Sequence, residues 1–475
     1  MNPNVSDHLA LDARTRYALD SALVRGAGCP LGSGHHHSTE AETGAEAMST
    51  ICVIGAQRGD EGKARVVDLL ADEADLIVRY QGGSNAGHTV MFGGETYRLH
   101  LVPSGIFRPG KVCVVAHGVV VDPEVLFAEI DELRARGHDV GPHNLVVSDR
   151  AQLVMPWHLA FDHARESADG DRKMGTTGRG IGPCYADKVS YRGIRVADLY
   201  DRAWFEERLR LNLDEKNLIL ERVFGLPPID LASVRDTYLA WGDRLRPFVG
   251  DAVDLLHEAV ATGRQILFEG AQAALLDVDL GVYPYVTASN SSALGVCAGT
   301  GLPPRAIDRV IGCAKAYATH VGSGPFPTED LGDEGRRLRD VGREYGTTTG
   351  RPRRCGWFDA VAVRFAVRSN GIDALALVKL DVLRGFPRLR ICTAYDLPPG
   401  RTTRLPASVP DVMAAVPVYR ELTGFEEDVS GARRFDDLPS PARDFVLAIE
   451  AECGVPVELV SVGPSREQVI RRARG

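Results

Sequence analysis

The sequence lacks the features that would place the protein in a membrane, in an oxidising compartment or on nucleic acid. Across its 475 residues, no run approaches the roughly 18 consecutive apolar residues that a membrane helix needs. Nine cysteines are scattered without a CxxC pair, a pattern that signals neither a disulfide framework nor a zinc site. The formal net charge of −9 argues against a nucleic-acid-binding surface. We therefore expect a cytoplasmic protein that acts on small molecules, with no membrane or nucleic-acid partner.

The first 49 residues differ in composition from the rest of the chain. The segment from Pro30 to Gly44 (PLGSGHHHSTEAETG) is polar, contains glycine and serine, and has little apolar surface to bury. Its three consecutive histidines could bind a metal weakly, but a solvated linker is the simpler interpretation. We predict a disordered N-terminal extension over residues 1–49 and one large domain over residues 50–475.

From residue 50 onward, buried-strand patterns alternate with helical patterns. Helical spacing predicts helices over residues 65–70 and 123–136, and over much of 198–223 and 231–261. Alternating strands and helices are typical of an α/β fold with a mostly parallel central sheet flanked by helices. Such sheets carry their ligand sites in loops at the carboxyl ends of the strands. Short apolar runs predict strands over residues 51–54, 76–80, 112–116, 144–148, 265–268, 374–378 and 457–462.

The loop after the first predicted strand, Gly55–Lys63 (GAQRGDEGK), is glycine-rich like a P-loop but has two acidic residues at its centre. The usual P-loop pattern fails at two positions, because Gln57 replaces its first glycine and Ala64 replaces its hydroxyl residue. The remaining glycines and lysine still open a helix, whose N-terminal N–H groups and dipole suit phosphates. The loop is therefore predicted to be a P-loop-NTPase-like phosphate loop, with a function for the acidic pair still to be found.

A second glycine-rich loop, Gln81–Thr89 (QGGSNAGHT), follows the next predicted strand and contains His88. Together the two loops resemble the adenylosuccinate synthetase family, whose members join IMP to L-aspartate with GTP. The resemblance covers about residues 50–470. Further segments similar to that family follow in the same order: 175–183 (GTTGRGIGP), 268–272 (FEGAQ), 283–287 (YPYVT), 322–328 (GSGPFPT), 348–354 (TTGRPRR), 379–381 (KLD) and 461–464 (SVGP).

The resemblance implies a GTP-dependent ligase of purine (AMP) biosynthesis that forms a C–N bond through a 6-phosphoryl-IMP intermediate. In this family the aspartate of the GDEGK motif is the general base, and Asp60 matches it. His88 matches the residue that acts as the acid and stabilises the developing charge. Mg²⁺ is the implied cofactor, with Asp60 and the carbonyl of Gly87 as its protein ligands. The resemblance also implies a homodimer.

The resemblance extends to the residues that would contact substrates. Asp381 would accept hydrogen bonds from guanine N1–H and the 2-amino group, and Arg351 would hold the aspartate carboxylates. The implied contacts to IMP and L-aspartate come from Asp60, Glu61, Gly62, Lys63, Asn85, Ala86, Gly87, His88, Thr177, Tyr191, Gln272, Thr287, Thr347, Thr348, Thr349, Gly350 and Arg351. The implied contacts to GTP come from Gly59, Asp60, Glu61, Gly62, Lys63, Ala64, Arg65, Gly87, His88, Thr89, Arg353, Lys379, Leu380, Asp381, Ser461, Val462 and Gly463.

Several departures from the family pattern lie on the side of the nucleotide acceptor. Arg58 stands where tryptophan is usual, and Tyr191 stands where a basic residue reaches the partner subunit to hold the IMP phosphate. Two alternatives therefore stay open: a paralogue that aminates a related 6-oxopurine nucleotide in secondary metabolism, and a non-catalytic guanine-nucleotide-binding protein. Asp60 and His88 argue against the second alternative, because a protein that only binds has no use for that pair.

Overall fold

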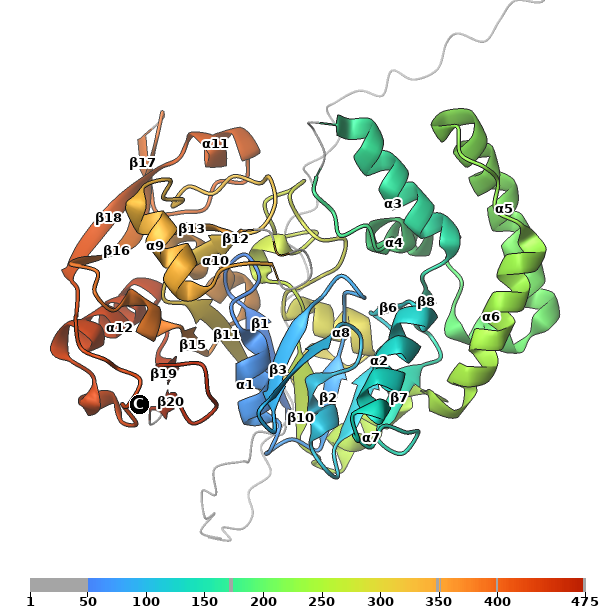
Figure 1. Ribbon diagram of the computed structural model, residues 1–475, viewed down its shortest axis with the longest axis horizontal. Coiled ribbons are helices and arrows are strands. Elements are labelled where there is room, and N and C mark those ends of the chain that lie inside the picture. The colour runs from blue at the N-terminus through green and yellow to red at the C-terminus, as the bar shows by residue number, and fades with distance from the viewer. Residues whose placement is uncertain (1–49, 171–173, 347–349, 351, 399, 473–475) are drawn as a thin grey trace, which may run out of the picture. The chain divides into compact units, whose positions relative to one another are not determined.

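The computed structural model describes residues 50–170, 174–346, 350, 352–398 and 400–472, so the predicted N-terminal extension lies outside the described residues. A ten-stranded sheet runs through the described part of the chain (Figure 1). Every neighbouring pair is parallel except β19–β20, which is antiparallel. Across the sheet the strands follow the order β20 (Val469–Arg471), β19 (Val457–Ser461), β15 (Ala374–Val378), β11 (Arg309–Lys315), β1 (Thr50–Gly55), β10 (Ile266–Glu269), β2 (Leu76–Arg79), β5 (Val112–Val115), β7 (Leu145–Ser148) and β9 (Val249–Gly250).

All seven strands predicted from apolar runs form and belong to this sheet, which confirms the predicted α/β fold. The sequence patterns missed β11, although it lies directly beside β1. Its run (RVIGCAK) is interrupted by Gly312, which weakens a strand pattern. A Cβ at Gly312 would come within 2.7 Å of Ile372, so the glycine allows close packing at that point.

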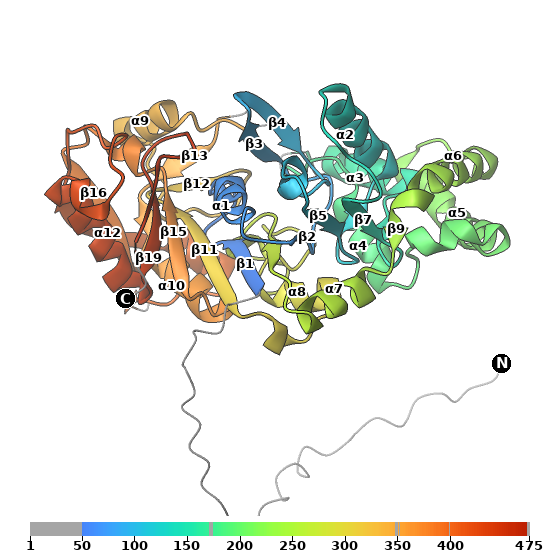
Figure 2. The same cartoon turned by 90° about the horizontal axis from the view of Figure 1, so that it is seen from below.

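Two apolar layers enclose the sheet, because successive residues of a strand point to opposite faces. Cys52 and Ile54 of β1 face one layer, which contains residues of α7 (Ala252–Ala261), α8 (Leu294–Thr300), α10 (Ala360–Asn370) and α12 (Ser440–Cys453). Val53 faces the other layer, which contains residues of α1 (Lys63–Leu70) and α2 (Pro123–Ala135). Figure 2 shows these two groups of helices on opposite sides of the strands. Parallel strands covered on both faces explain why the predicted strands are continuous apolar runs.

The helices occupy most of the chain between the strands. The predicted helical stretch over residues 231–261 is two helices, because Pro247 lies between them and β9 follows. The α-helices are α1 (Lys63–Leu70), α2 (Pro123–Ala135), α3 (Pro156–Asp169), α4 (Ile181–Val189), α5 (Arg202–Phe224), α6 (Leu231–Leu245), α7 (Ala252–Ala261), α8 (Leu294–Thr300), α9 (Asp333–Gly342), α10 (Ala360–Asn370), α11 (Val409–Ala414) and α12 (Ser440–Cys453). Short 3₁₀ helices cover Ser104–Phe107, Val196–Tyr200, Arg246–Phe248, Ala274–Leu276, Pro304–Ala306, Leu380–Leu383 and Phe435–Asp437.

Smaller sheets surround the central one. A mixed group around the long strand β16 (Arg388–Leu397) lies on the side of α12, and an antiparallel hairpin follows the second glycine-rich loop (Figure 1). None of the helices in the described ranges is both long enough and apolar enough to span a membrane. The remaining strands are β3 (His88–Phe92) with β4 (Glu95–Leu99), β6 (Val120–Val121) with β8 (Gln152–Leu153), β12 (Ala318–His320) with β13 (Arg354–Gly356), and β14 (Phe358–Asp359) with β16 (Arg388–Leu397), β17 (Gly400–Thr402) and β18 (Val416–Thr423).

Candidate active site

A cleft of about 980 Å³ lies over the loops that follow β1, β2, β10 and β15. These loops meet because the carboxyl ends of parallel strands share one edge of a sheet. The predicted residues that line the cleft are Gly59, Asp60, Gly62, Lys63, Ala64, Arg65, Asn85, Ala86, Gly87, His88, Thr89, Thr177, Gln272, Thr287, Arg353 and Lys379.

The two acidic residues of the first glycine-rich loop have different environments. Glu61 is completely buried, and its carboxylate accepts hydrogen bonds from the backbone N–H of Gly59 (2.7 Å) and from Lys63 Nζ (2.7 Å). It therefore holds the loop together from inside rather than facing the cleft. A Cβ at Gly55 would meet Glu61 Oε2 at 2.5 Å, which explains the glycine where the strand ends. Asp60 instead lines the cleft with its side chain 37% exposed.

The backbone of Asp60 adopts a left-handed conformation, with φ 59°. Non-glycine residues rarely adopt positive φ, and such strain concentrates at functional sites. Five non-glycine residues have this conformation in the described part of the chain, and four of them are predicted site residues: Asp60, Tyr191 (φ 66°), Gln272 (φ 54°) and Lys379 (φ 63°). The local backbone thus marks the same positions that the sequence motifs indicate.

Helix α1 begins directly after the loop and offers its N-terminus to the cleft. Its N-cap, Gly62, has φ 77° and provides no side chain to cap the free backbone N–H groups. The first turn contains no acidic residue. Free N–H groups and the helix dipole attract anions, so this end of the helix suits a phosphate group.

His88 is held from behind by a carboxylate that sequence reasoning did not select. Its Nδ1 contacts Glu269 Oε1, which leaves Nε2 as the ring nitrogen for a ligand. The other oxygen of Glu269 accepts hydrogen bonds from the backbone N–H (2.9 Å) and Oγ (2.8 Å) of Ser104. Burial alone would raise the pKa of Glu269, but the attraction of His88 and Arg79 outweighs it and lowers this pKa to about 2. Burial lowers the pKa of His88.

Glu269 could have been suspected from the sequence, because it is the only charged residue in the run Ile266–Glu269 and ends a strand where sites form.

Two predicted IMP contacts carry buried oxygens that have no hydrogen-bond partner among the described residues. These are the side-chain carbonyl oxygens of Asn85 and Gln272, and both residues line the cleft. The amide nitrogen of Asn85 donates to Thr287 Oγ1 at 3.4 Å. Buried polar atoms are normally paired, so unpaired ones at a cleft wall are sites where a ligand donor gains a hydrogen bond.

The predicted guanine-binding segments meet at the end of β15 and β19. Lys379 lines the cleft, Asp381 lies half-buried in the 3₁₀ helix behind it, and burial raises the pKa of Asp381. Arg65 of α1 donates to Ser461 Oγ (2.6 Å) and to the carbonyl of Gly463 (2.7 Å). The phosphate loop and the loop after β19 are thus joined by one arginine, a contact between residues 396 positions apart that the motifs did not reveal.

The structure does not bring every predicted residue to the cleft. Tyr191 is 88% exposed in the turn after α4, away from the cleft lining of its own chain. Thr347, Thr348, Thr349 and Arg351 lie outside the described residues. The predicted residues that the cleft lining does not include are Glu61, Tyr191, Gly350, Leu380, Asp381, Ser461, Val462 and Gly463.

The oxygen donors at the cleft suit Mg²⁺ bound partly by substrate. Asp60 presents a partly exposed carboxylate, and Gly87 presents exposed backbone at the same cleft. Within the described ranges, no cluster of three or more His, Cys, Asp or Glu residues could hold a metal without a ligand. Because Mg²⁺ usually takes one or two carboxylates together with substrate phosphates and water, these donors fit it.

Comparison with known proteins agrees with the geometry. Residues 52–470 match the sequence model of the adenylosuccinate synthetase family. The chain is 50% identical to the adenylosuccinate synthetase of Syntrophobacter fumaroxidans over 423 residues, which cover 89% of this chain and 99% of that protein. It is also 50% identical to the Geobacter sulfurreducens adenylosuccinate synthetase, with coverages of 89% and 98%.

Among solved structures, the fully ligated adenylosuccinate synthetase from Plasmodium falciparum superposes with a TM-score of 0.84. Its sequence identity to this chain is 33%, with 90% of this chain and 100% of that chain covered.

Proposed function

Because the chain belongs to the adenylosuccinate synthetase family, we propose that it joins IMP and L-aspartate to form adenylosuccinate, with GTP converted to GDP and phosphate. The enzyme is a ligase that forms a C–N bond in purine (AMP) biosynthesis. The observation that carries the residue roles is the convergence of Asp60, His88 and the free N-terminus of α1 on one cleft.

Asp60 acts as the general base in the first step. It accepts the proton on N1 of IMP, which moves negative charge onto the 6-oxygen. This oxygen attacks the γ-phosphorus of GTP, so that a new P–O bond forms and GDP leaves. The step is needed because an amine cannot displace the 6-oxygen directly, whereas phosphate is a good leaving group. Lys63 and the N–H groups that open α1 stabilise the charge on the phosphates in transit.

His88 stabilises the charge that develops on the 6-oxygen and on the transferred phosphoryl group. In the ligand-free protein burial favours its neutral form, but an arriving anion favours protonation. Glu269, an ionised carboxylate against Nδ1, then stabilises the imidazolium. In the second step the amine of L-aspartate attacks C6, the C6–O bond breaks, and phosphate leaves with the electron pair while the amine loses a proton.

Mg²⁺ is the proposed cofactor, with Asp60 and the carbonyl of Gly87 as its protein ligands. When bound, it would neutralise negative charge between the carboxylate and the phosphates.

Different residues of the site bind the different substrates. Asn85 and Thr287 hold the IMP phosphate together with Thr177, and the unpaired oxygen of Gln272 accepts a hydrogen bond near the purine ring. Asp381 reads guanine, because its carboxylate accepts from N1–H and the 2-amino group. The role of Arg351 at the aspartate carboxylates rests on its sequence motif alone.

We further propose a cytoplasmic homodimer. The eight cysteines among the described residues are all free thiols, as expected for a reducing compartment. In the dimer, the exposed Tyr191 would reach the acceptor site of the partner subunit.

The test is an assay of the purified protein with GTP, L-aspartate and a panel of 6-oxopurine nucleotides. We expect adenylosuccinate and GDP to form from IMP in equal amounts, and we expect IMP to be preferred. Product only from another nucleotide would favour the paralogue, and GTP binding without any product would favour the non-catalytic protein. No observation on the structure favours either alternative.

A further inference from the structure

A buried carboxylate, Glu344, connects two parts of the cleft. It lies two residues beyond the end of α9 and is completely buried. Its Oε1 accepts hydrogen bonds from Lys379 Nζ (2.6 Å) and Tyr317 OH (2.5 Å). Its Oε2 accepts from Lys315 Nζ (2.9 Å) and Arg353 Nη1 (2.7 Å). One side chain thus fixes three cations that come from three separate segments.

Two of these cations, Lys379 and Arg353, line the cleft. Lys379 belongs to the guanine-reading segment and also donates to the carbonyl of Gly342 at 2.7 Å. Arg353 reaches the catalytic loop, where its Nε lies 2.9 Å from Asp60 Oδ2. The contacts therefore form a continuous chain from the guanine pocket to the proposed base: Lys379, Glu344, Arg353 and Asp60.

Lys315 also contacts Glu344, and with it the positive charges outnumber the negative ones. Among the described residues, the three cations Lys315, Lys379 and Arg353 contact two carboxylates, those of Glu344 and Asp60. An excess of positive charge at a cleft wall suits a polyanion, whose arrival would draw Arg353 or Lys379 toward the ligand. Because both cations share the carboxylate of Glu344, a displacement of one changes the charge that holds the other.

We propose that Glu344 is a positioning residue that couples occupation of the guanine pocket, through Lys379, to the placement of Arg353 beside Asp60. This inference rests on the proposed function, because it takes Lys379 as part of the guanine site and Asp60 as the base. Binding of guanine in the pocket then affects the position of Arg353 beside Asp60. We therefore expect a higher kcat with GTP than with a nucleotide whose base makes fewer contacts in the pocket.

A double-mutant cycle tests the coupling. Lys379→Met and Arg353→Lys are made singly and together, and kcat with saturating GTP is measured. With Glu344 present, we expect kcat of the double variant to differ from the product of the two single effects by about tenfold. In a Glu344→Gln background, we expect the same cycle to agree with the product within about twofold. Additive effects in the protein that keeps Glu344, or coupling that survives Glu344→Gln, would overturn the proposal.

Two controls separate positioning from stability. Asp187→Asn removes another buried carboxylate that contacts a lysine, and it should lower the melting temperature while leaving the tenfold coupling intact. Should Glu344→Gln not fold, Glu344→Asp replaces it, because it keeps the charge but withdraws the carboxylate by one methylene group. If the unmodified enzyme makes no adenylosuccinate, the proposed function fails by itself. The cycle is then read on the Kd for GTP, where the same tenfold and twofold criteria apply.

Discussion

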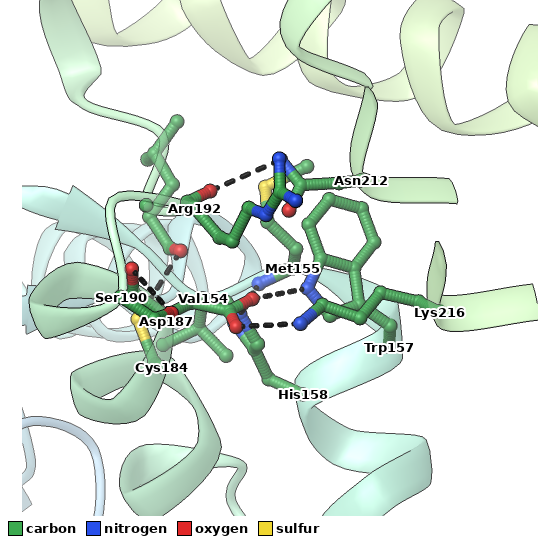
Figure 3. Close-up of polar contacts among 12 residues, drawn as sticks. Val154, Met155, Trp157, His158, Cys184, Asp187, Ser190, Arg192, Asn212 and Lys216 are labelled. Atoms are coloured by element: carbon green, nitrogen blue, oxygen red, sulfur yellow. Dashed lines mark hydrogen bonds and ion pairs between the residues drawn. The ribbon is translucent and has the colours of Figure 1, made fainter. Parts of the chain in front are cut away.

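Two buried carboxylates, Glu344 at the cleft and Asp187 in the helical region, have similar partners but different surroundings. Asp187 of α4 accepts hydrogen bonds from Trp157 Nε1 (2.9 Å), His158 Nε2 (2.9 Å) and Lys216 Nζ (2.7 Å). Figure 3 shows these side chains converging on it from the neighbouring helices α3 and α5. Burial lowers the pKa of His158, and Lys216 also contacts Glu215 Oε1 at 3.5 Å, so that the described contacts of Asp187 leave no positive charge in surplus.

The balance of charge distinguishes the two regions. The contacts of Asp187 are complete without a ligand, and its partners Trp157, His158 and Lys216 do not line the cleft. Its backbone carbonyl also accepts from the N–H groups of Arg192 (2.8 Å) and Gly193 (2.9 Å). Asp187 therefore stabilises the packing of α3, α4 and α5 and the turn around Tyr191. The surplus cations around Glu344 instead suit the binding of an anion. A buried ion pair indicates a ligand site only when its charges are left uncompensated at a cavity.

Asp60→Asn tests the proposed general base, and we expect it to have the largest effect on activity. The amide keeps the shape but cannot accept the N1 proton, so kcat should fall by about 10²- to 10⁴-fold. Binding of GTP, measured by calorimetry, should stay largely intact. Asp131→Asn, which removes an exposed carboxylate paired with Arg244, is the matched control and should keep full activity. Turnover of Asp60→Asn within a few-fold of the unmodified enzyme would contradict its role as the base.

The balanced region should respond in stability rather than in chemistry. Asp187→Asn leaves Lys216 without its buried carboxylate partner, which typically costs about 3–5 kcal/mol in the free energy of unfolding. Denaturant titration at neutral pH measures this loss. A change below about 1 kcal/mol would show that the lysine finds other compensation.

The same residue predicts a pH dependence. Burial alone would raise the pKa of Asp187, but hydrogen bonds from His158 and Lys216 outweigh it and lower the pKa to about 2. Because this pKa is below the value of about 4 in an unfolded chain, the contribution of Asp187 to stability is full above about pH 4 and is lost as the pH falls toward 2. Stability of the unmodified protein should therefore fall more steeply over this range than that of Asp187→Asn. Parallel curves would refute the ionised, hydrogen-bonded state of Asp187.

Asp381 lies two residues after Lys379, in the proposed guanine site. Asp381→Asn should weaken GTP binding and partly relieve discrimination against ITP or XTP. Because the charged acceptor for N1–H and the 2-amino group is lost, we expect kcat/KM for GTP to fall roughly tenfold. Competition kinetics with the three nucleotides give the ratio. Full retention of the GTP preference would mean that another residue reads guanine.

The turn held by Asp187 predicts a smaller, substrate-specific effect. Tyr191 can donate one hydrogen bond to a phosphate but brings no positive charge, so we expect a KM for IMP near or above about 1 mM, the upper end of common values. Tyr191→Arg should lower this KM several-fold, and only in the dimer, because the side chain would act on the partner subunit. A low micromolar KM for the unmodified protein, without any decrease in Tyr191→Arg, would show that the IMP phosphate is bound normally despite Tyr191.

The smallest effect is expected outside both regions. Deleting residues 1–47, which precede the family match at residue 52, should leave the melting temperature and kinetics nearly unchanged, because the segment is polar. A large fall in either would show that the segment contributes to the folded domain.

Local sequence patterns determined the alternation of strands and helices and the order of the glycine-rich loops. Buried parallel strands are apolar on both faces, so seven of them could be recognised from short runs alone. The motifs also led to Asp60, His88 and Lys379, which the structure brings to one cleft. Such features are local, because the periodicity of apolar residues and the residue types that form turns depend only on residues close in the sequence.

The tertiary structure alone decided how charged residues are partnered. Glu61 turns inward to Lys63 while its neighbour Asp60 faces the cleft, a difference that adjacent positions in one motif do not reveal. His88 meets Glu269 across 181 positions, and Glu344 meets Lys379 across 35. These pairings depend on which strands lie side by side in the sheet and on the desolvation of each carboxylate. Neither the strand order nor the desolvation is encoded in a local pattern, so the motifs predicted the site residues while the fold decided how their charges are partnered.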